Sequence, residues 1–329
     1  MRRSKHPEVI FYEGFDKEQD VQNKKFPDSR QKLVSFTSSV SASGVGSLQL
    51  MIPSRTGAAM SGLWRTNFSD NETIKFGAGD DLYVQWRQRF SNSLLDAVYI
   101  GGGGWKQIIL GEGDPRGFNY GDAGEVGSCS TLEIVIQNVL HRAFPQMYHS
   151  CGEYQPFQAG FKSQYNQHDY KLQNAIDNLT GTSDKERYVL YSQEKNRTNK
   201  VRSDFPGMAY FPNEWMTFQV HLKPGPLGTA TDSLTGKQKS GFTRSTVEMW
   251  VAREGQASVK THSFSGVVLR RHDGASDTGE KYGKIWLLAY NTGKDSSKTY
   301  PEAYTWYDEL IISKSKIADP IINNTNKSR

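Results

Sequence analysis

The nine residues LYVQWRQRF, at positions 82–90, decide the fold class of this 329-residue chain. Successive residues of a β-strand point to opposite faces of a sheet, so this stretch separates into two sets. The polar set is Tyr83, Gln85, Arg87 and Arg89. The opposite, largely apolar set is Val84, Trp86, Gln88 and Phe90. This alternation predicts a strand that packs one face on a core and turns a polar face outward.

Similar short runs recur along the chain and are separated by Gly, Pro, Asn, Asp and Ser. The other predicted strands are Val9–Tyr12, Ser47–Ile52, Trp105–Leu110, Leu132–Asn138, Trp215–Leu222, Thr246–Ala252, Lys284–Tyr290 and Tyr304–Ser313. Helical periodicity is nearly absent, and no run has the long Val/Ile stretch of a buried parallel strand. The pattern predicts an all-β protein, an antiparallel β-sandwich.

Two segments interrupt this pattern. Gly101–Gly104 is predicted to bend tightly or to approach another group closely, and it lacks the Lys-Ser/Thr of a phosphate-binding loop. Residues 141–212 are polar and rich in Tyr, Gln and Asn, and they are predicted to form a long insertion that is a lid or a groove wall. A short helix is expected at Asp169–Leu179, and a flexible tail at 321–329.

The composition limits the class of partner. The formal charge is +5 and 36% of the residues are hydrophobic, which suffices for a core. No run reaches the roughly 20 apolar residues of a membrane helix, so no membrane insertion is expected. Basic residues are scattered among nearly as many acids and no nucleic-acid-binding motif is present, which disfavours nucleic acid. An anionic polysaccharide fits the charge at least as well.

Two cysteines, Cys129 and Cys151, leave two interpretations open. They form one disulfide across a loop of about 20 residues, or they are unrelated buried thiols. The first residues, MRRSKHPEV, contain no apolar segment of a signal peptide. We expect an extracellular or secreted protein, either in its mature form or carried outside by another route, such as a virus particle.

Four stretches, read in order, resemble the concanavalin A-like lectin/glucanase jelly roll. They are FYEGFD at 11–16 with GSLQLMI at 46–52, FPNEWMTFQVHLKPG at 211–225, VEMWVAREG at 247–255 and YTWYDELIIS at 304–313. They span most of the chain, so the resemblance implies one jelly-roll domain over residues 1–320. The superfamily contains glycoside hydrolases, polysaccharide lyases, lectins and binding modules, so it leaves the activity open.

The resemblance also implies a structural calcium ion between the first and last strands. Its oxygen donors would be the carboxylates of Glu13 and Asp308 with backbone carbonyls such as that of Gly46. Calcium takes roughly six to eight oxygen ligands, and carbonyls count among them. The alternative is that Asp308 caps a strand end and Glu13 is solvated.

Retaining glucanases of this fold carry Glu-x-Asp-x-Glu on one strand. The nearest match here is Glu133-Ile-Val-Ile-Gln137, with valine in place of the aspartate. The amide of Gln137 cannot donate the proton that a leaving sugar needs, so hydrolysis by this route is disfavoured.

Polysaccharide lyases of this fold neutralise the carboxylate of a uronic acid before its C5 proton is removed. Arginine and amide side chains suit that task, since guanidinium pairs with carboxylate through two parallel hydrogen bonds. Alternation places Trp105, Gln107 and Ile109 on one face of their strand, and does the same for Glu133, Val135 and Gln137 and for Thr217, Gln219 and His221. The predicted substrate-binding residues of a single concave sheet are Tyr83, Gln85, Arg87, Arg89, Gln107, Glu133, Gln137 and Gln219.

The match to the alginate lyases of this superfamily is partial. Their Gln-Ile-His strand corresponds to residues 107–109, where isoleucine replaces histidine, and their Tyr-x-Lys-x-Gly-x-Tyr strand is not visible. A catalytic base is therefore expected elsewhere, at Tyr148 and His149, or else at His221. No Ser-His-Asp or His-x-x-His arrangement stands out. Trp105, Trp250 and Trp286 are interpreted as core residues rather than as platforms for sugars.

Together these features favour a polysaccharide lyase-like protein that cleaves or binds a uronic-acid-containing polysaccharide by β-elimination in a concave-sheet groove. A lyase is favoured over a glycoside hydrolase. The alternative is a non-catalytic carbohydrate-binding protein or a surface or virion structural protein of the same fold. A polar face on an antiparallel strand is also often only solvated, so Arg87 and Arg89 need a structure to assign them.

Overall fold

We describe the fold from a computed structural model. The described residues are 3–22, 32–53, 57–59, 62–71, 73–95, 97, 99–112, 132–139, 146–150, 210–233, 236–269, 281–295 and 297–320. Helix is confined in these segments to the 3-10 turn η1 (Arg3–Lys5) and to α1 (Glu18–Gln22) and α2 (Asn92–Leu95). None of the described helices has the length and apolar character needed to cross a membrane.

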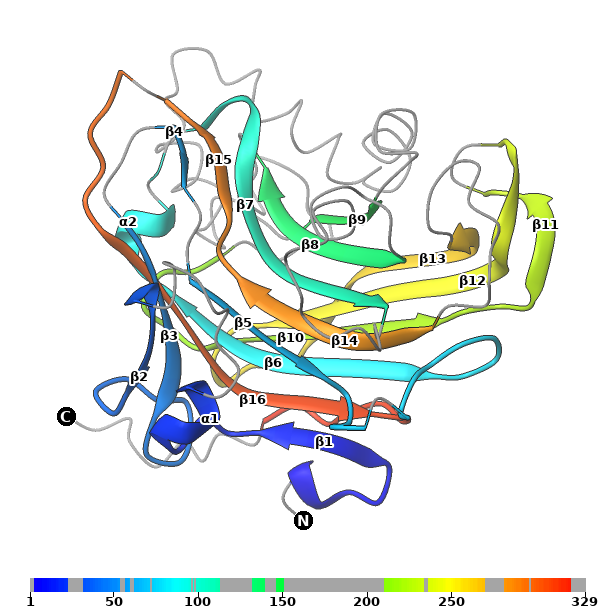
Figure 1. The fold of residues 1–329 in the computed structure, drawn as a ribbon, viewed down its shortest axis with the longest axis horizontal. Helices are drawn as coiled ribbons and strands as arrows, with labels where there is room; N and C mark the ends of the chain where they lie inside the picture. Colours follow the sequence, from blue (N-terminus) through cyan, green and yellow to red (C-terminus); the bar gives the residue numbers. More distant parts are fainter. Residues whose placement is uncertain are drawn as a thin grey trace.

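The described strands form two antiparallel sheets that lie one above the other (Figure 1). The larger, sheet A, has the order β11-β12-β10-β6-β16-β3-β2, with β1 beside β16 and β13 beside β12. Its strands are β1 (Val9–Glu13), β2 (Val34–Thr37), β3 (Ser47–Ile52), β6 (Leu82–Phe90), β10 (Met216–Lys223), β11 (Leu227–Thr231), β12 (Gln238–Ala252), β13 (Val259–Leu269) and β16 (Ala303–Ser313). Strands from both ends of the chain are neighbours, because β1 pairs with β16.

The smaller sheet, sheet B, has the order β4-β15-β7-β14-β5, and β8 and β9 extend it beyond β7. Its strands are β4 (Gly57–Ala59), β5 (Leu63–Asn67), β7 (Tyr99–Glu112), β8 (Glu133–Val139), β9 (Gln146–Ser150), β14 (Tyr282–Leu288) and β15 (Asn291–Lys294). In Figure 1 the backbones of β7, β8 and β15 bend away from sheet A. The outer side of sheet B is therefore concave, and the outer side of sheet A is convex.

Apolar side chains fill the space between the sheets. Trp86 of β6 stacks on Phe218 of β10 with ring centroids 5.4 Å apart, and Phe90 meets Trp105 of β7 at 5.5 Å. Each large apolar side chain buried in this way contributes roughly 1.5–3 kcal/mol relative to its exposed state. Trp86 and Phe90 belong to the apolar set that alternation predicts for residues 82–90.

A chain of hydrogen bonds crosses the same interior. The amide of Gln107 donates to Oε1 of Gln88 at 2.8 Å, and the hydroxyl of Tyr210 donates to Oε1 of Gln107 at 3.1 Å. The Tyr307 hydroxyl lies 2.7 Å from the backbone oxygen of Gln107. Buried polar groups are tolerated when they are paired in this way, so these residues fix the two sheets together.

All nine predicted strands are present, and Ser47–Ile52 and Leu82–Phe90 have the predicted bounds. Gly101–Gly104 lie within β7, where Gly104 pairs with Thr292 and the register to β15 then shifts before Tyr99 pairs with Lys294. Whether these glycines bend tightly or approach another group closely stays a prediction. Most of the insertion at 141–212, the helix at Asp169–Leu179, the tail at 321–329 and both cysteines lie outside the described residues. The single-domain prediction for 1–320 therefore stays a prediction.

Candidate functional site

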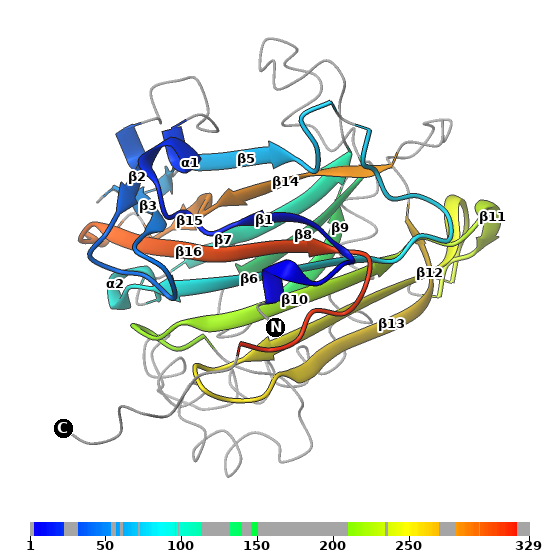
Figure 2. The ribbon, with the colours of Figure 1, turned by 90° about the horizontal axis from the view of Figure 1, so that it is seen from below.

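The polar row predicted on residues 82–90 exists, and it lies on the convex outer face of sheet A. Register with β10 places Tyr83 opposite His221, Gln85 opposite Gln219 and Arg87 opposite Thr217. The predicted faces of both strands are thus confirmed. Figure 2 looks onto this face, where η1 and the segment after β16 cross in front of β6 and β10.

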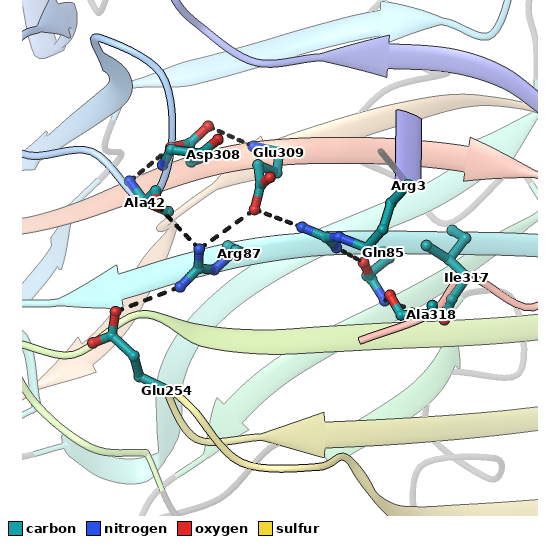
Figure 3. Close-up of polar contacts among 10 residues, drawn as sticks. Arg3, Ala42, Gln85, Arg87, Glu254, Asp308, Glu309, Ile317 and Ala318 are labelled. Carbon is teal, nitrogen blue, oxygen red and sulfur yellow. Dashed lines mark hydrogen bonds and ion pairs between the residues drawn. The ribbon is translucent and has the colours of Figure 1, made fainter. Parts of the chain in front are cut away.

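Arg87 is held by the chain's own groups (Figure 3). Its guanidinium lies 3.4 Å from the Glu309 carboxylate and 3.5 Å from that of Glu254, and it donates to the backbone oxygen of Ala42 at 3.2 Å. Glu309 also pairs with Arg3 of η1 at 2.6 Å. Arg87 is only 4% exposed, so this arginine stabilises the fold instead of facing a ligand.

The amides of this row anchor both ends of the described chain. Gln219 and Ile317 bond reciprocally: the Ile317 N–H donates to Oε1 at 2.8 Å, and Nε2 donates to the Ile317 oxygen at 3.0 Å. Gln85 donates to the oxygen of Ala318 at 3.2 Å and accepts a hydrogen bond from Arg3. These contacts use the donors and acceptors that we assigned to substrate.

Arg89, at the end of the row, is partly exposed on β6 and lies opposite Trp306 of β16. The described residues form no ion pair with it. It shares no face with Gln107, which lies between the sheets, or with Gln137, which belongs to sheet B.

His221 is fixed between two carboxylates. Its Nε2 lies 2.7 Å from Oδ1 of Asp81, its Nδ1 lies 2.9 Å from Oε2 of Glu248, and Tyr83 stacks on the ring at 4.2 Å. Burial raises the pKa of Asp81 and of Glu248. Hydrogen bonds from a lysine and from His221 outweigh burial and hold both pKa values below their usual range. Both ring nitrogens therefore face ionised acceptors, and neither is available to take a proton from a substrate.

The prediction that Gln107 shares a groove with Arg87 is wrong. Gln107 lies between the two sheets, on the same face of β7 as Trp105, and a β-bulge begins at this residue. Lys106 pairs with Gln137 of β8 but Ile108 pairs with Ile136, so Gln107 is the extra residue. The bulge reverses the alternation, and Ile109 turns to the face opposite Gln107.

The predicted calcium ligands also have other partners. Oδ2 of Asp308 accepts hydrogen bonds from the N–H groups of Ala42 and Ser43 at 2.8 and 3.0 Å, and its Oδ1 accepts from Glu309 N at 2.7 Å. Burial raises the pKa of Asp308 to about 7. An oxygen pair that faces three N–H donors suits an anchor for the 42–43 loop better than a cation ligand.

Glu13 likewise accepts from the N–H of Phe15 at 3.2 Å. A side chain at Gly46 would lie 2.1 Å from the Phe36 ring, so this glycine is required for packing. No group of three or more His, Cys, Asp or Glu side chains among the described residues could hold a metal ion. The residues fit calcium poorly here, and calcium at Glu13, Gly46 and Asp308 stays a prediction.

The concave outer face of sheet B carries a second polar set. Strand register defines two parallel rows that cross the sheet from β5 to β9. The first row is Arg65, Trp286, Ile109, Val135 and Tyr148. The second row is Asn67, Lys284, Gly111, Glu133 and Ser150. Directly opposite residues of antiparallel strands share a face, so each row is a continuous line of side-chain positions.

Two cations and an indole form one end of these rows. Arg65 lies opposite Trp286, and the ammonium of Lys284 lies 4.9 Å from the Trp286 ring centroid. Arg65 is 4% exposed, Lys284 7% and Trp286 6%. Burying charged groups costs free energy, so two buried cations on one face of a sheet make this face a candidate site.

Glycine leaves room beside this group. A Cβ atom at Gly111 would lie 3.4 Å from Cγ of Glu133 and 3.6 Å from Cε of Lys284. The acidic and basic side chains therefore converge above Gly111 from the strands on either side. Glu133 and Gln137 share this face, as predicted, and Lys106 lies opposite Gln137.

The two predicted catalytic residues of β9 differ in register. Tyr148 lies opposite Val135 and so occupies the first row, whereas His149 lies opposite Ile134 and belongs to the other face. This assignment rests on backbone pairing alone. Of the three predicted bases, only Tyr148 takes a position on the concave face.

Our sequence reasoning missed Arg65 and Lys284. Lys284 and Trp286 alternate with Ile285 and Leu287, a signal visible in the predicted strand at 284–290. Trp286 is buried in the hydrophobic core cluster, as we interpreted it, and it lies on the same face of β14 as Lys284. Arg65 lies in LWRTN, a run too short to separate from a loop.

No family model matches the sequence, and no curated protein matches it. Among solved structures, a marine PL-14 alginate lyase from Aplysia kurodai is similar with a TM-score of 0.50 and 12% identity, over 92% of this chain and 98% of that one. An endo-β-1,4-glucuronan lyase from the fungus Trichoderma reesei gives 0.47 and 13%, over 93% and 96%. The cellulose induced protein Cip1 gives 0.41 and 14%, over 94% and 100%. With the two antiparallel sheets, the likeness to the Aplysia enzyme establishes that this chain has the concanavalin A-like jelly-roll fold.

Proposed function

We propose that this protein binds an acidic polysaccharide across the concave face of sheet B and cleaves it by β-elimination. The observation that carries the proposal is the buried pair of cations, Arg65 and Lys284, on either side of Trp286. A guanidinium and an ammonium in a low-dielectric site pair strongly with carboxylate. The similar enzyme from Aplysia is an alginate lyase, and alginate is a polysaccharide of this chemical class.

Arg65 and Lys284 would pair with the carboxylate of one uronate of the bound chain. In the uronate that is cleaved, a neutralised carboxylate makes the adjacent C5 proton more acidic. A base removes that proton, the C5–H electron pair forms the C4–C5 double bond, and the C4–O bond breaks. An acid protonates the departing oxygen, so no oxidant or other reactant is consumed.

Tyr148 is our proposed base, because it is the one of the three predicted bases whose register places it on the concave face. Its strand lies four strands from that of Arg65 and three from that of Lys284, so it would act on a sugar unit further along the bound chain than the unit that these cations hold. His221 has no role here, since its two nitrogens are bound to carboxylates on the other sheet.

A non-catalytic polysaccharide-binding protein is the second candidate. The described side chains of the concave face provide cations, amides, an indole and one carboxylate, and no histidine. Such a set suffices to bind an anionic chain without cleaving it.

The test uses alginate, glucuronan, pectate and hyaluronan. Absorbance of the unsaturated uronate measures cleavage, and affinity electrophoresis in gels containing each polysaccharide measures binding. Cleavage of one of them supports the lyase, whereas retention without absorbance supports the binding protein. Neither signal with any of the four would contradict both.

Lys284→Met tests the site. We expect it to weaken binding at least tenfold, because a charge-assisted contact of roughly 1.5–3 kcal/mol is lost. Lys223→Met is the matched control, since Lys223 is an exposed strand lysine on the convex face, paired with Asp81. Equal binding by both variants would show that the binding site is not on sheet B.

A further inference from the structure

The indole N–H of Trp286 is buried and has no hydrogen-bond partner among the residues that the structure describes. Other described tryptophans differ. Trp64 donates to the Asp20 oxygen at 3.0 Å and Trp86 to Oε1 of Gln88 at 3.1 Å. Buried donors are almost always paired in folded proteins, so an exception requires an explanation, such as a ligand.

The neighbours of this N–H limit what the ligand could be. Arg65 lies opposite Trp286 on β5, and Ile109 lies opposite it on β7. Lys284 lies over the ring of Trp286. The one carboxylate in the two described rows belongs to Glu133, which approaches Lys284 above Gly111. The indole N–H is a donor, so the missing group is an acceptor, and the two cations beside it favour an acceptor with negative charge.

We infer that Trp286 donates its indole N–H to the carboxylate of a bound uronate and thereby selects uronates over neutral sugars. This inference rests on the proposed function, because it assumes that a polysaccharide occupies the concave face. A cation recognises charge from several directions, whereas a fixed N–H adds a directional requirement. Three donors on one carboxylate would discriminate against a sugar that has a hydroxymethyl group there, because the donors would lose their acceptor.

Trp286→Phe tests the inference, because phenylalanine keeps an aromatic ring beneath Lys284 and removes only the donor and the second ring. We expect affinity for the bound polysaccharide to fall about tenfold, as for loss of a hydrogen bond to a charged group. We expect the melting temperature to fall less than in Trp86→Phe below, because both variants lose a buried ring but only Trp86 gives up a hydrogen bond.

The matched control is Trp86→Phe, in which the lost N–H has a partner in Gln88. We expect it to lower the melting temperature and leave affinity unchanged. A polysaccharide whose carboxyl groups have been reduced to hydroxymethyl provides a second control, on which wild type and Trp286→Phe should bind equally.

The outcomes separate the two proposals. If the wild type binds none of the four polysaccharides, the proposed function fails. If the wild type binds and Trp286→Phe binds equally well, the inference about the indole fails and the proposed function stands. A drop in melting temperature like that of Trp86→Phe, with no change in affinity, would assign Trp286 to packing.

Discussion

The two outer faces of the sandwich carry similar side chains and differ in what those side chains contact. On sheet A, the Nη atoms of Arg87 and the amides of Gln85 and Gln219 contact Glu309, Ile317 and other groups of the same chain. On sheet B, Arg65 and Lys284 lie beside a tryptophan whose N–H has no described partner. A row of polar residues along a strand thus predicts which face they occupy. It does not predict whether those side chains contact a ligand or other groups of the protein.

The largest effect is expected for Arg87→Ala. This change removes the buried member of an ion-pair network, leaves Glu309 with Arg3 alone and takes the hydrogen bond from Ala42, so it should lower the free energy of unfolding by about 3 kcal/mol. Chemical denaturation measures this, while binding per folded molecule should not change. Arg89→Ala, on the same face of the same strand, should cost less than about 1 kcal/mol. A stable Arg87→Ala protein that no longer binds polysaccharide would restore the convex face as the site.

A smaller effect is expected for Gln219→Ala, which removes both hydrogen bonds to Ile317. Loss of these bonds should cost roughly 1–2 kcal/mol and loosen the segment after β16. Limited trypsin digestion should then cleave faster at Lys314 and Lys316. Exposed Gln256 provides the control as Gln256→Ala, and equal cleavage of both variants would show that the amide does not hold the segment.

The smallest effect concerns pH and Asp308. Burial raises its pKa to about 7 in the folded protein, above the value of 3.8 for an isolated carboxyl group. The folded state therefore binds this proton more tightly, and the stability it contributes is lost as pH rises from about 4 through 7. The nearby charge of Glu309 adds to this rise in the pKa of Asp308.

Asp308→Asn keeps an oxygen for the N–H groups of Ala42 and Ser43 and cannot ionise. Its melting temperature should exceed that of the wild type at pH 8 and approach it at pH 5. Thermal melts at both values measure the difference. A constant difference across this range would mean that Asp308 does not titrate there.

The sequence by itself determined the strands, their inward and outward faces, and the sandwich. Alternation over 82–90 and 215–222 predicted both faces correctly, because the pleat of a strand is a local property of the backbone. It failed at Ile109, which does not share the face of Trp105 and Gln107, because a bulge depends on how β8 pairs with β7 and leaves no signal in the sequence of β7 alone.

Only the tertiary structure decided which polar row, that of sheet A or that of sheet B, is the candidate ligand site. The groups that cover Arg87 and Gln85 come from Arg3, Glu309 and Ala318, which are distant in sequence from β6. Likewise, Arg65, Trp286 and Tyr148 lie in one row only because β5, β14, β7, β8 and β9 take that order in sheet B. The pleat of a strand is local, so the sequence of the strand predicts it. Which groups contact a polar row, and which strands lie side by side, depends on residues far apart in the chain, and no local pattern encodes those contacts.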